Sequence, residues 1–340
     1  MTVVMLVLDG LGARSVTPGV MPTLTGWGNR GMIRPNGATS VLCASTYPNF
    51  ASIVTGAMPH QHGLFTNRVV TDGTIRSGSE VGPAVPSFFD EDSEVVVGDQ
   101  NLIGVVAARS AGRHWPPSGV LPAGTSVDQF GYVTDDEVAG RTVAALDRRP
   151  EFLFVQLNSP DTMAHIHGPD SEEATNSYRS LDDALAVIDT ALDLERDMLL
   201  VTSDHDQESI DSTRRVDLET TVLVQGIEVT VVEEGTAAML VGPGADKTEW
   251  LDAAPGVADW VAAGPGMCLA FTEPGWWFAG PDSPDLKGAH GGPRTRATIA
   301  VAAGPSWLLE SIRPKLVARR FGAEDWFGLV ETVRLLASGR

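Results

Sequence analysis

Three apolar runs of this 340-residue chain each lead into an aspartate. The run "TVVMLVL" precedes Asp9, "FLFVQL" precedes a segment that contains Asp161, and "MLLVTS" precedes Asp204. Apolar runs without polar alternation are typical of strands buried on both faces of a largely parallel sheet. Because ligands of such sheets collect beyond the carboxyl ends of the strands, we expect the three aspartates to lie at one edge, beside a site.

Helical patterns lie between these runs. The clearest spans 171–194, where apolar residues recur at helical spacing. Towards the end of the chain, "ATIAVAAG" has the character of another buried strand and "EDWFGLVETVRLLAS" predicts a closing amphipathic helix. Strands that alternate with helices predict an α/β fold with a mostly parallel central sheet flanked by helices.

The pattern changes between 207 and 289. Segments such as "EVTVVEE" and "TAAMLVG" are followed by a predicted helical stretch at about 247–263, and then by "MCLAFTE" and "GWWFAG". We interpret 207–289 as a small α+β insertion in a catalytic core formed by 1–206 and 290–340.

Composition excludes several classes of protein. A formal net charge of −20 argues against binding of a nucleic-acid duplex, because that requires Lys and Arg to neutralise phosphates. Two cysteines, Cys43 and Cys268, indicate no disulfide framework. The first apolar run has no basic segment before it and is too short to cross a bilayer, so we expect a soluble, cytoplasmic protein without a membrane partner. The oligomeric state is not predicted.

The segment "CASTYPNFASIVTG", residues 43–56, predicts a helix start. Thr46 is a suitable N-cap, Pro48 is tolerated in the first turn, and Gly56 can end the helix. The positive end of such a helix would attract an anion beside the Thr46 hydroxyl. Capping alone would also explain this threonine, so both interpretations stay open from the segment itself.

Histidines and carboxylates form three groups: Asp161 with His165, Asp204 with His205, and His290 in "KGAHGG". These residue types suit zinc or a similar divalent ion. Each group alone could be a polar loop, but strand ends can bring all of them together around two ions. Three aspartates against two divalent ions leave a charge close to +1, which would attract a small phosphate anion despite the acidic composition.

Taken together, the motifs resemble the alkaline phosphatase superfamily, and within it the nucleotide pyrophosphatase/phosphodiesterase branch, to which phosphonoacetate hydrolase is related. The resemblance depends on "VLDGLG", "TYPNFASIVTGAMPHQHGL", "SPDTMAHIHGP", "SDH" and "GAHGG", which occur in the family's order along the whole chain. As a set these motifs are specific, although "SDH" or "VLDG" alone would mean little.

The resemblance implies a hydrolase with two divalent ions, zinc or manganese, and Thr46 as the nucleophile that forms a phosphothreonine intermediate. It implies that one ion is held by Asp9, Thr46, Asp204 and His205, and the other by Asp161, His165 and His290. It further implies that Asn49, in the Thr-x-Pro-Asn pattern, donates a hydrogen bond to a phosphoryl oxygen. Three aromatic residues are candidates for stacking on the substrate: Phe65, Trp115 and Tyr132.

Some positions depart from the family pattern. Asp206 replaces the glycine that usually follows the Asp-His pair, Gly292 stands where an aromatic is common, and Asn158 and Ser159 replace acidic residues. These positions border the site but remove no ligand. No arginine stands beside Thr46 as it does in phosphate monoesterases, so we expect a small phosphodiester substrate.

Alternatives remain. A phosphonate (C–P) hydrolase is the nearest, because "TYPNFASIVTGA" fits that relation equally well. A sulfatase is disfavoured, since "CASTY" lacks the required Pro and Arg, and "DGLGARS" lacks the third glycine of a dinucleotide-binding loop. A metal-binding module without turnover is the alternative from another class.

Overall fold

A seven-stranded sheet forms the centre of the molecule in the computed structural model, which describes residues 1–339. Its strand order is β2-β17-β8-β1-β7-β5-β6. The bounds are β1 Val3–Leu8, β2 Met32–Thr39, β5 Ser93–Val97, β6 Arg113–Trp115, β7 Phe152–Leu157, β8 Met198–Thr202 and β17 Ala297–Ala303. Among these seven strands, β17 alone runs opposite to the other six, so the expected mostly parallel α/β sheet is confirmed.

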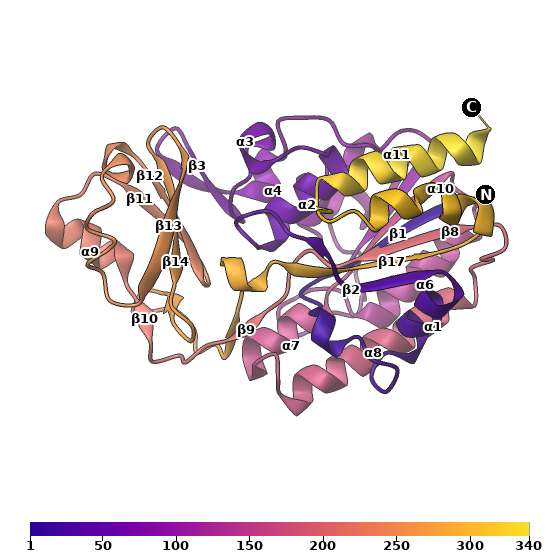
Figure 1. The fold of residues 1–340 in the computed structure, drawn as a ribbon, viewed down its shortest axis with the longest axis horizontal. Helices are drawn as coiled ribbons and strands as arrows, with labels where there is room; N and C mark the ends of the chain where they lie inside the picture. Colours follow the sequence, from indigo (N-terminus) through magenta and orange to yellow (C-terminus); the bar gives the residue numbers. More distant parts are fainter. Residues whose placement is uncertain (340) are drawn as a thin grey trace.

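Helices cover both faces of this sheet (Figure 1). One layer contains α1 Pro22–Arg30, α6 Asp135–Leu146 and α8 Glu172–Asp189, and the other contains α2 Thr46–Thr55, α10 Ser306–Leu316 and α11 Asp325–Ser338. Alternate side chains of β1 enter opposite cores: Val4 and Leu6 pack in the first layer, and Val3 and Met5 in the second. Two buried faces explain why the strand is apolar throughout.

Two predicted helices appear as expected. The pattern at 171–194 forms α8, which begins where the Ser171 side chain accepts a hydrogen bond from the Ala174 amide. The closing pattern forms α11 and ends at Gly339 in the left-handed conformation.

A smaller four-stranded antiparallel sheet lies at one end of the molecule, on the left of Figure 1. Its order is β11-β12-β14-β13, with bounds Thr230–Glu234, Ala237–Val241, Met267–Thr272 and Val257–Gly264, and the helix α9 Leu218–Gln225 packs beside it. The chain enters this part through β9 Glu208–Ser209 and leaves it through β16 Gly288–Ala289, which pair with each other. The sheet lies within the predicted insertion 207–289, whose exact bounds stay a prediction.

The prediction of a helix at about 247–263 is wrong. Turns occupy the first part of this range, and β13 begins at Val257 and pairs with β14. Pro255 and Gly256, the latter at φ +86, interrupt any helix at this point. The apolar segment that follows instead forms hydrogen bonds with β14, a tertiary partner that local spacing does not reveal.

The remaining elements are short. They are α3 Pro59–His62, β3 Arg68–Thr71, β4 Thr74–Ser77, α4 Gly78–Val81, α5 Leu102–Val105, α7 Ser159–His167, β10 Arg215–Val216 and β15 Trp277–Phe278. Single 3-10 turns occur at Ala13–Ser15, Ala108–Ser110, Pro117–Gly119, Pro243–Asp246 and Pro293–Thr295.

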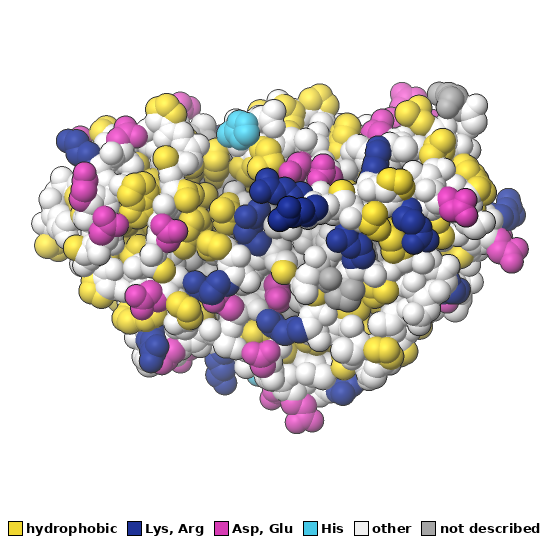
Figure 2. Space-filling view, viewed as in Figure 1, with side chains coloured by type: hydrophobic (Ala, Val, Ile, Leu, Met, Phe, Trp, Pro, Cys, Tyr) yellow, Lys and Arg dark blue, Asp and Glu magenta, His cyan; other side chains and the backbone are white. Residues whose placement is uncertain are grey.

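The surface mixes charges of both signs. On the face shown in Figure 2, Lys and Arg side chains gather near the middle although the whole chain is strongly acidic. Within residues 1–339, no helix combines the length and apolar character needed to cross a membrane.

Candidate active site

The three aspartates that follow the apolar runs meet at one edge of the central sheet. Strands β8, β1 and β7 are parallel neighbours, so their carboxyl ends lie side by side. Asp9 follows β1, Asp161 lies in α7 directly after β7, and Asp204 follows β8. This arrangement is the one expected from the strand pattern.

Three potential ligand atoms lie near the Nε2 atom of His205, which is itself a fourth. This Nε2 atom lies 3.3 Å from Thr46 Oγ1, 3.3 Å from Asp204 Oδ2 and 3.7 Å from Asp9 Oδ1. Both carboxylates are buried, and Asp9 Oδ1 and Asp204 Oδ2 accept no hydrogen bond from the part of the chain that the structure describes. Buried carboxylate oxygens without partners are costly, so these two atoms fit a cation.

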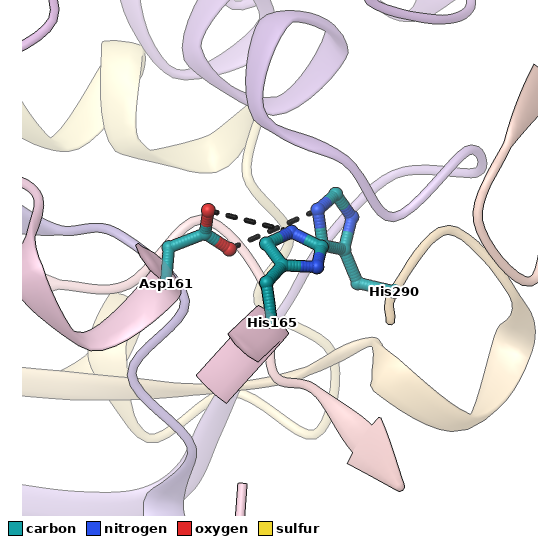
Figure 3. Close-up of side chains that lie close together, drawn as sticks. All are labelled: Asp161, His165 and His290. Carbon is teal, nitrogen blue, oxygen red and sulfur yellow. Dashed lines mark ion pairs between the residues drawn. The ribbon is translucent and has the colours of Figure 1, made fainter. Parts of the chain in front are cut away.

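A second group lies against the first. Asp161 Oδ2 is 3.5 Å from His165 Nε2, and Asp161 Oδ1 is 3.8 Å from His290 Nε2. Figure 3 shows that Asp161 and His165 come from the same helix, α7, whereas His290 reaches them from a separate loop. Asp161 also lies within 4.8 Å of ligand atoms of Asp9 and His205, so the two groups are adjacent.

All three histidines present Nε2 to the carboxylates. Their Nδ1 atoms lie beside backbone oxygens: His165 at 2.9 Å from Gly288 O, His205 at 3.2 Å from Asp206 O, and His290 at 3.1 Å from Ala44 O. An Nδ1–H that donates to a carbonyl leaves the Nε2 lone pair free to bind a metal. Burial also holds the pKa of His290 well below its usual value, which keeps that ring neutral.

The carboxylates carry unfavourable charge in the absence of a cation. Burial, and then the charges of Asp204 and Asp161, raise the pKa of Asp9 well above its usual value. Burial also raises the pKa of Asp204. A divalent ion would offset both the desolvation and the mutual repulsion, so the charge balance supports a metal centre.

Two glutamines that sequence reasoning missed orient the aspartates. Gln156 Nε2 donates to Asp9 Oδ2 at 3.0 Å, and Gln207 Nε2 donates to Asp161 Oδ1 at 2.6 Å. Gln156 is the one polar residue in the apolar run of β7, which is a signal that could have identified it. Gln207 has no such local signal, because Asp161 is far away in sequence. Side chains that hold metal ligands in place commonly contribute to metal affinity.

Thr46 does not act as a helix cap. Ser45 occupies the N-cap position, Thr46 is the first residue of α2, and its hydroxyl lies beside His205. The helix ends at Gly56 with φ 66, as the sequence predicted. The threonine hydroxyl therefore lies at the N-terminus of a helix and at the edge of the candidate metal centre.

The structure surrounds the Asn49 side chain with backbone groups of the preceding loop. Its side chain is fully buried, its Oδ1 accepts from the Val41 amide at 2.7 Å, and its Nδ2 donates to Ser45 O and Cys43 O. These three bonds join the side-chain amide of Asn49 to backbone groups that lie just before Thr46 in the chain. Asn49 therefore shapes the loop that carries Thr46, and its hydrogen bond to a phosphoryl oxygen stays a prediction.

A cavity of about 380 Å³ opens beside the metal-ligand candidates. It is lined by Asp9, Thr46, Tyr47, Asn67, Asp99, Phe130, Tyr132, Asn158, Asp161, His165, Pro284, Leu286 and His290. Asn67, which sequence reasoning missed, accepts a hydrogen bond at Oδ1 from the Tyr47 amide at 2.8 Å. That bond fixes the orientation of the Asn67 side-chain amide. The Nδ2 atom of Asn67 therefore remains available to donate to a ligand beside Thr46.

Of the three aromatic candidates for substrate stacking, Tyr132 lines the cavity. Phe65 and Trp115 are not among the described residues that line it, and their contact with a substrate stays a prediction. Phe65 packs against the smaller sheet, and Trp115 packs in the core beneath the central sheet with the Arg141 guanidinium 5.1 Å from its ring. Tyr47 and Phe130 line the cavity instead.

The sheet and the paired ligand groups define an alkaline phosphatase-like α/β protein with a candidate metal centre. The family model for type I phosphodiesterase / nucleotide pyrophosphatase matches residues 3–266. The chain belongs to this family.

Curated relatives carry related names. The rat ectonucleotide pyrophosphatase/phosphodiesterase family member 1 is 28% identical over 223 residues, which cover 59% of this chain and 23% of the relative. The mouse bis(5'-adenosyl)-triphosphatase is 25% identical over 195 residues, covering 54% of this chain and 42% of the relative. The match therefore spans less than half the length of either relative.

Solved structures show the same fold. A murine ectonucleotide pyrophosphatase/phosphodiesterase 5 in complex with AMP matches with a TM-score of 0.73 and 16% identity, covering 98% of this chain and 95% of the other. A phosphonoacetate hydrolase from Sinorhizobium meliloti in complex with phosphonoacetate matches with a TM-score of 0.75 and 18% identity, covering 98% and 96%.

Proposed function

We propose that this protein is a two-metal phosphodiesterase or nucleotide pyrophosphatase in which Thr46 is the nucleophile. The observation that carries the proposal is the contact of 3.3 Å between Thr46 Oγ1 and His205 Nε2. The same His205 atom lies beside Asp9 Oδ1 and Asp204 Oδ2, two buried carboxylate oxygens that accept no hydrogen bond within residues 1–339. A hydroxyl in that setting is suited to activation as a nucleophile. The N-cap position of α2 is occupied by Ser45.

The ligand groups suit two divalent ions, for which zinc is our first candidate and manganese the second. We assign one ion to Asp9, Thr46, Asp204 and His205, and the other to Asp161, His165 and His290. When bound, such ions favour the ionised form of a hydroxyl and offset negative charge on a phosphoryl group. The mixed carboxylate and imidazole donors, with Nε2 presented by each ring, fit this role.

Residues of the chain would carry the reaction. Thr46 Oγ1 would lose its proton to solvent and form a bond to phosphorus as the bond to the leaving oxygen breaks, which gives a phosphothreonine. Water would then lose a proton and attack phosphorus, and the Thr46 oxygen would leave and take up a proton. The backbone amide of Thr46, at the N-terminus of α2, and the Nδ2 donor of Asn67 would stabilise the phosphoryl oxygens.

A diester suits the cavity better than a monoester. Among the described residues that line it, none is Lys or Arg, so the second negative charge of a monoester would have no side-chain cation beside it. The aromatic side chains of Tyr47, Phe130 and Tyr132 suit a planar group, and a murine structural neighbour was solved with AMP. Nucleotide esters are therefore the first class of natural substrate to test.

Hydrolysis of bis-4-nitrophenyl phosphate, 4-nitrophenyl phosphate and phosphonoacetate tests the proposal, with zinc or manganese added and then removed by a chelator. We expect chelator-sensitive turnover that favours the diester. Turnover of phosphonoacetate alone would establish the phosphonate hydrolase alternative. Metal binding without turnover of any of the three compounds would favour a non-catalytic module.

A further inference from the structure

Asp99 is a carboxylate in the cavity wall that belongs to neither ligand group. It follows the end of β5, the strand next to β7, and only 4% of the residue is exposed. It shares the cavity lining with Thr46 and Asn67. A buried acidic group therefore lines the same cavity as the proposed nucleophile.

The Asp99 carboxylate is held in place from one side. Its Oδ1 accepts from the backbone amide and the side-chain amide of Asn101, both at 2.9 Å, and its own amide donates to Gln156 Oε1. Its Oδ2 atom accepts no hydrogen bond from residues within the described range 1–339. One oxygen therefore fixes the group, and the second is available to a ligand in the cavity.

Within residues 1–339, no Lys or Arg side chain forms an ion pair with this carboxylate. Apart from the metal-ligand candidates, Asp99 is the only charged residue among those described as lining the cavity. Burial raises the pKa of Asp99 to about 6, so the group is mainly an anion at pH 7.5. Burial, and after it the charge of Asp99, also raise the pKa values of Tyr47 and Tyr132, which keeps both phenols neutral.

We propose that Asp99 determines substrate selectivity: it favours an ester substituent that carries an ammonium or hydroxyl donor and disfavours one that carries a second anion. The inference rests on the proposed phosphodiesterase function. A cation or donor gains a charge-assisted hydrogen bond at Oδ2. A carboxylate or phosphate in the same position would face a like charge in a partly buried site, where screening is weak.

A matched series of three diesters tests this selectivity: the 2-aminoethyl, ethyl and carboxymethyl esters of 4-nitrophenyl phosphate. All share the 4-nitrophenolate leaving group and differ mainly in the charge of the other substituent. For the zinc-loaded protein we expect kcat/KM to fall in the order aminoethyl, ethyl, carboxymethyl. In Asp99→Asn, the ratio of aminoethyl to ethyl should fall by about tenfold, the size expected for a hydrogen bond to a charged group.

Asparagine at position 99 can still accept both bonds from Asn101 at Oδ1, so the variant tests the charge while retaining those contacts. Asp92→Asn, an exposed carboxylate just before the opposite end of β5, is the matched control and should leave all ratios unchanged. Ratios in Asp99→Asn equal to those of the native protein would overturn the selectivity. Absence of turnover of all three esters by the native protein would overturn the phosphodiesterase function, and the selectivity with it.

Discussion

The hydroxyl of Thr46 lies 3.3 Å from Nε2 of His205, although 159 positions separate the two residues in the chain. One residue begins α2, and the other follows β8 at the edge of the central sheet. Their proximity joins a hydroxyl, a helix N-terminus and a group of buried carboxylates at one point. The proposed chemistry depends on this junction, and the first prediction tests it.

Thr46→Ala should reduce turnover of bis-4-nitrophenyl phosphate to background while the protein remains folded, because the change removes a reacting oxygen and no large packed group. Steady-state kinetics and thermal unfolding followed by circular dichroism measure the two effects. Thr46→Ser, which keeps the hydroxyl, is the matched variant and should retain measurable activity. Activity in Thr46→Ala equal to that of the native protein would exclude Thr46 as the nucleophile.

His290→Ala should lower the metal content of the protein, because the change removes a neutral imidazole that faces Asp161. We expect the metal-to-protein ratio, measured by elemental analysis after dialysis, to fall from about two towards one. The exposed His60, changed to alanine, is the control and should keep the native ratio. Two ions retained at full occupancy in His290→Ala would contradict its assignment as a ligand.

Gln207→Met should weaken metal binding without unfolding the protein. The change removes the 2.6 Å hydrogen bond to Asp161 Oδ1, but it also removes the Gln207 Oε1 atom, which is buried without a partner among the described residues. Loss of a group that orients a ligand typically costs about 10- to 100-fold in affinity, which competition with a chelator can measure. The exposed Gln225, changed to methionine, should have no effect. Unchanged affinity in Gln207→Met would limit this residue to packing.

Glu234→Gln should stabilise the protein more at pH 8 than at pH 5. Burial raises the pKa of Glu234 from 4.5 to about 7, so this group costs increasing stability as the pH rises through that interval. Glutamine remains neutral and can still accept from the Asn67 amide, as Glu234 Oε2 does at 2.9 Å. The gain at pH 8 should reach up to about 3 kcal/mol.

Urea unfolding at the two pH values, with a chelator present, measures this difference in the free energy of unfolding. Glu249→Gln, at an exposed position, is the control and should show little change between pH 5 and pH 8. An equal effect of Glu234→Gln at both pH values would show that Glu234 does not titrate in this range in the folded protein.

Much of the fold followed from local pattern. The runs that became β1, β7 and β8 are apolar apart from Gln156 and Thr202, because both faces of each strand are covered, a property visible without knowledge of the partners. Asp9, Asp161 and Asp204 could be placed together because parallel strands end at the same edge. The segment at 247–263 could not be assigned correctly, since an apolar stretch becomes β13 only when β14 is available to pair with it.

By itself, the sequence determined the α/β class, the edge of the sheet where the site lies and the residue types that gather there. Tertiary structure alone decided which side chains face the cavity. Asn49 turns inward to bond backbone groups, Asn67 and Asp99 line the cavity, and Gln207 reaches Asp161. The physical reason is that apolar burial and strand direction depend on near neighbours, whereas hydrogen-bond partners and cavity walls come from segments that meet only in the folded chain.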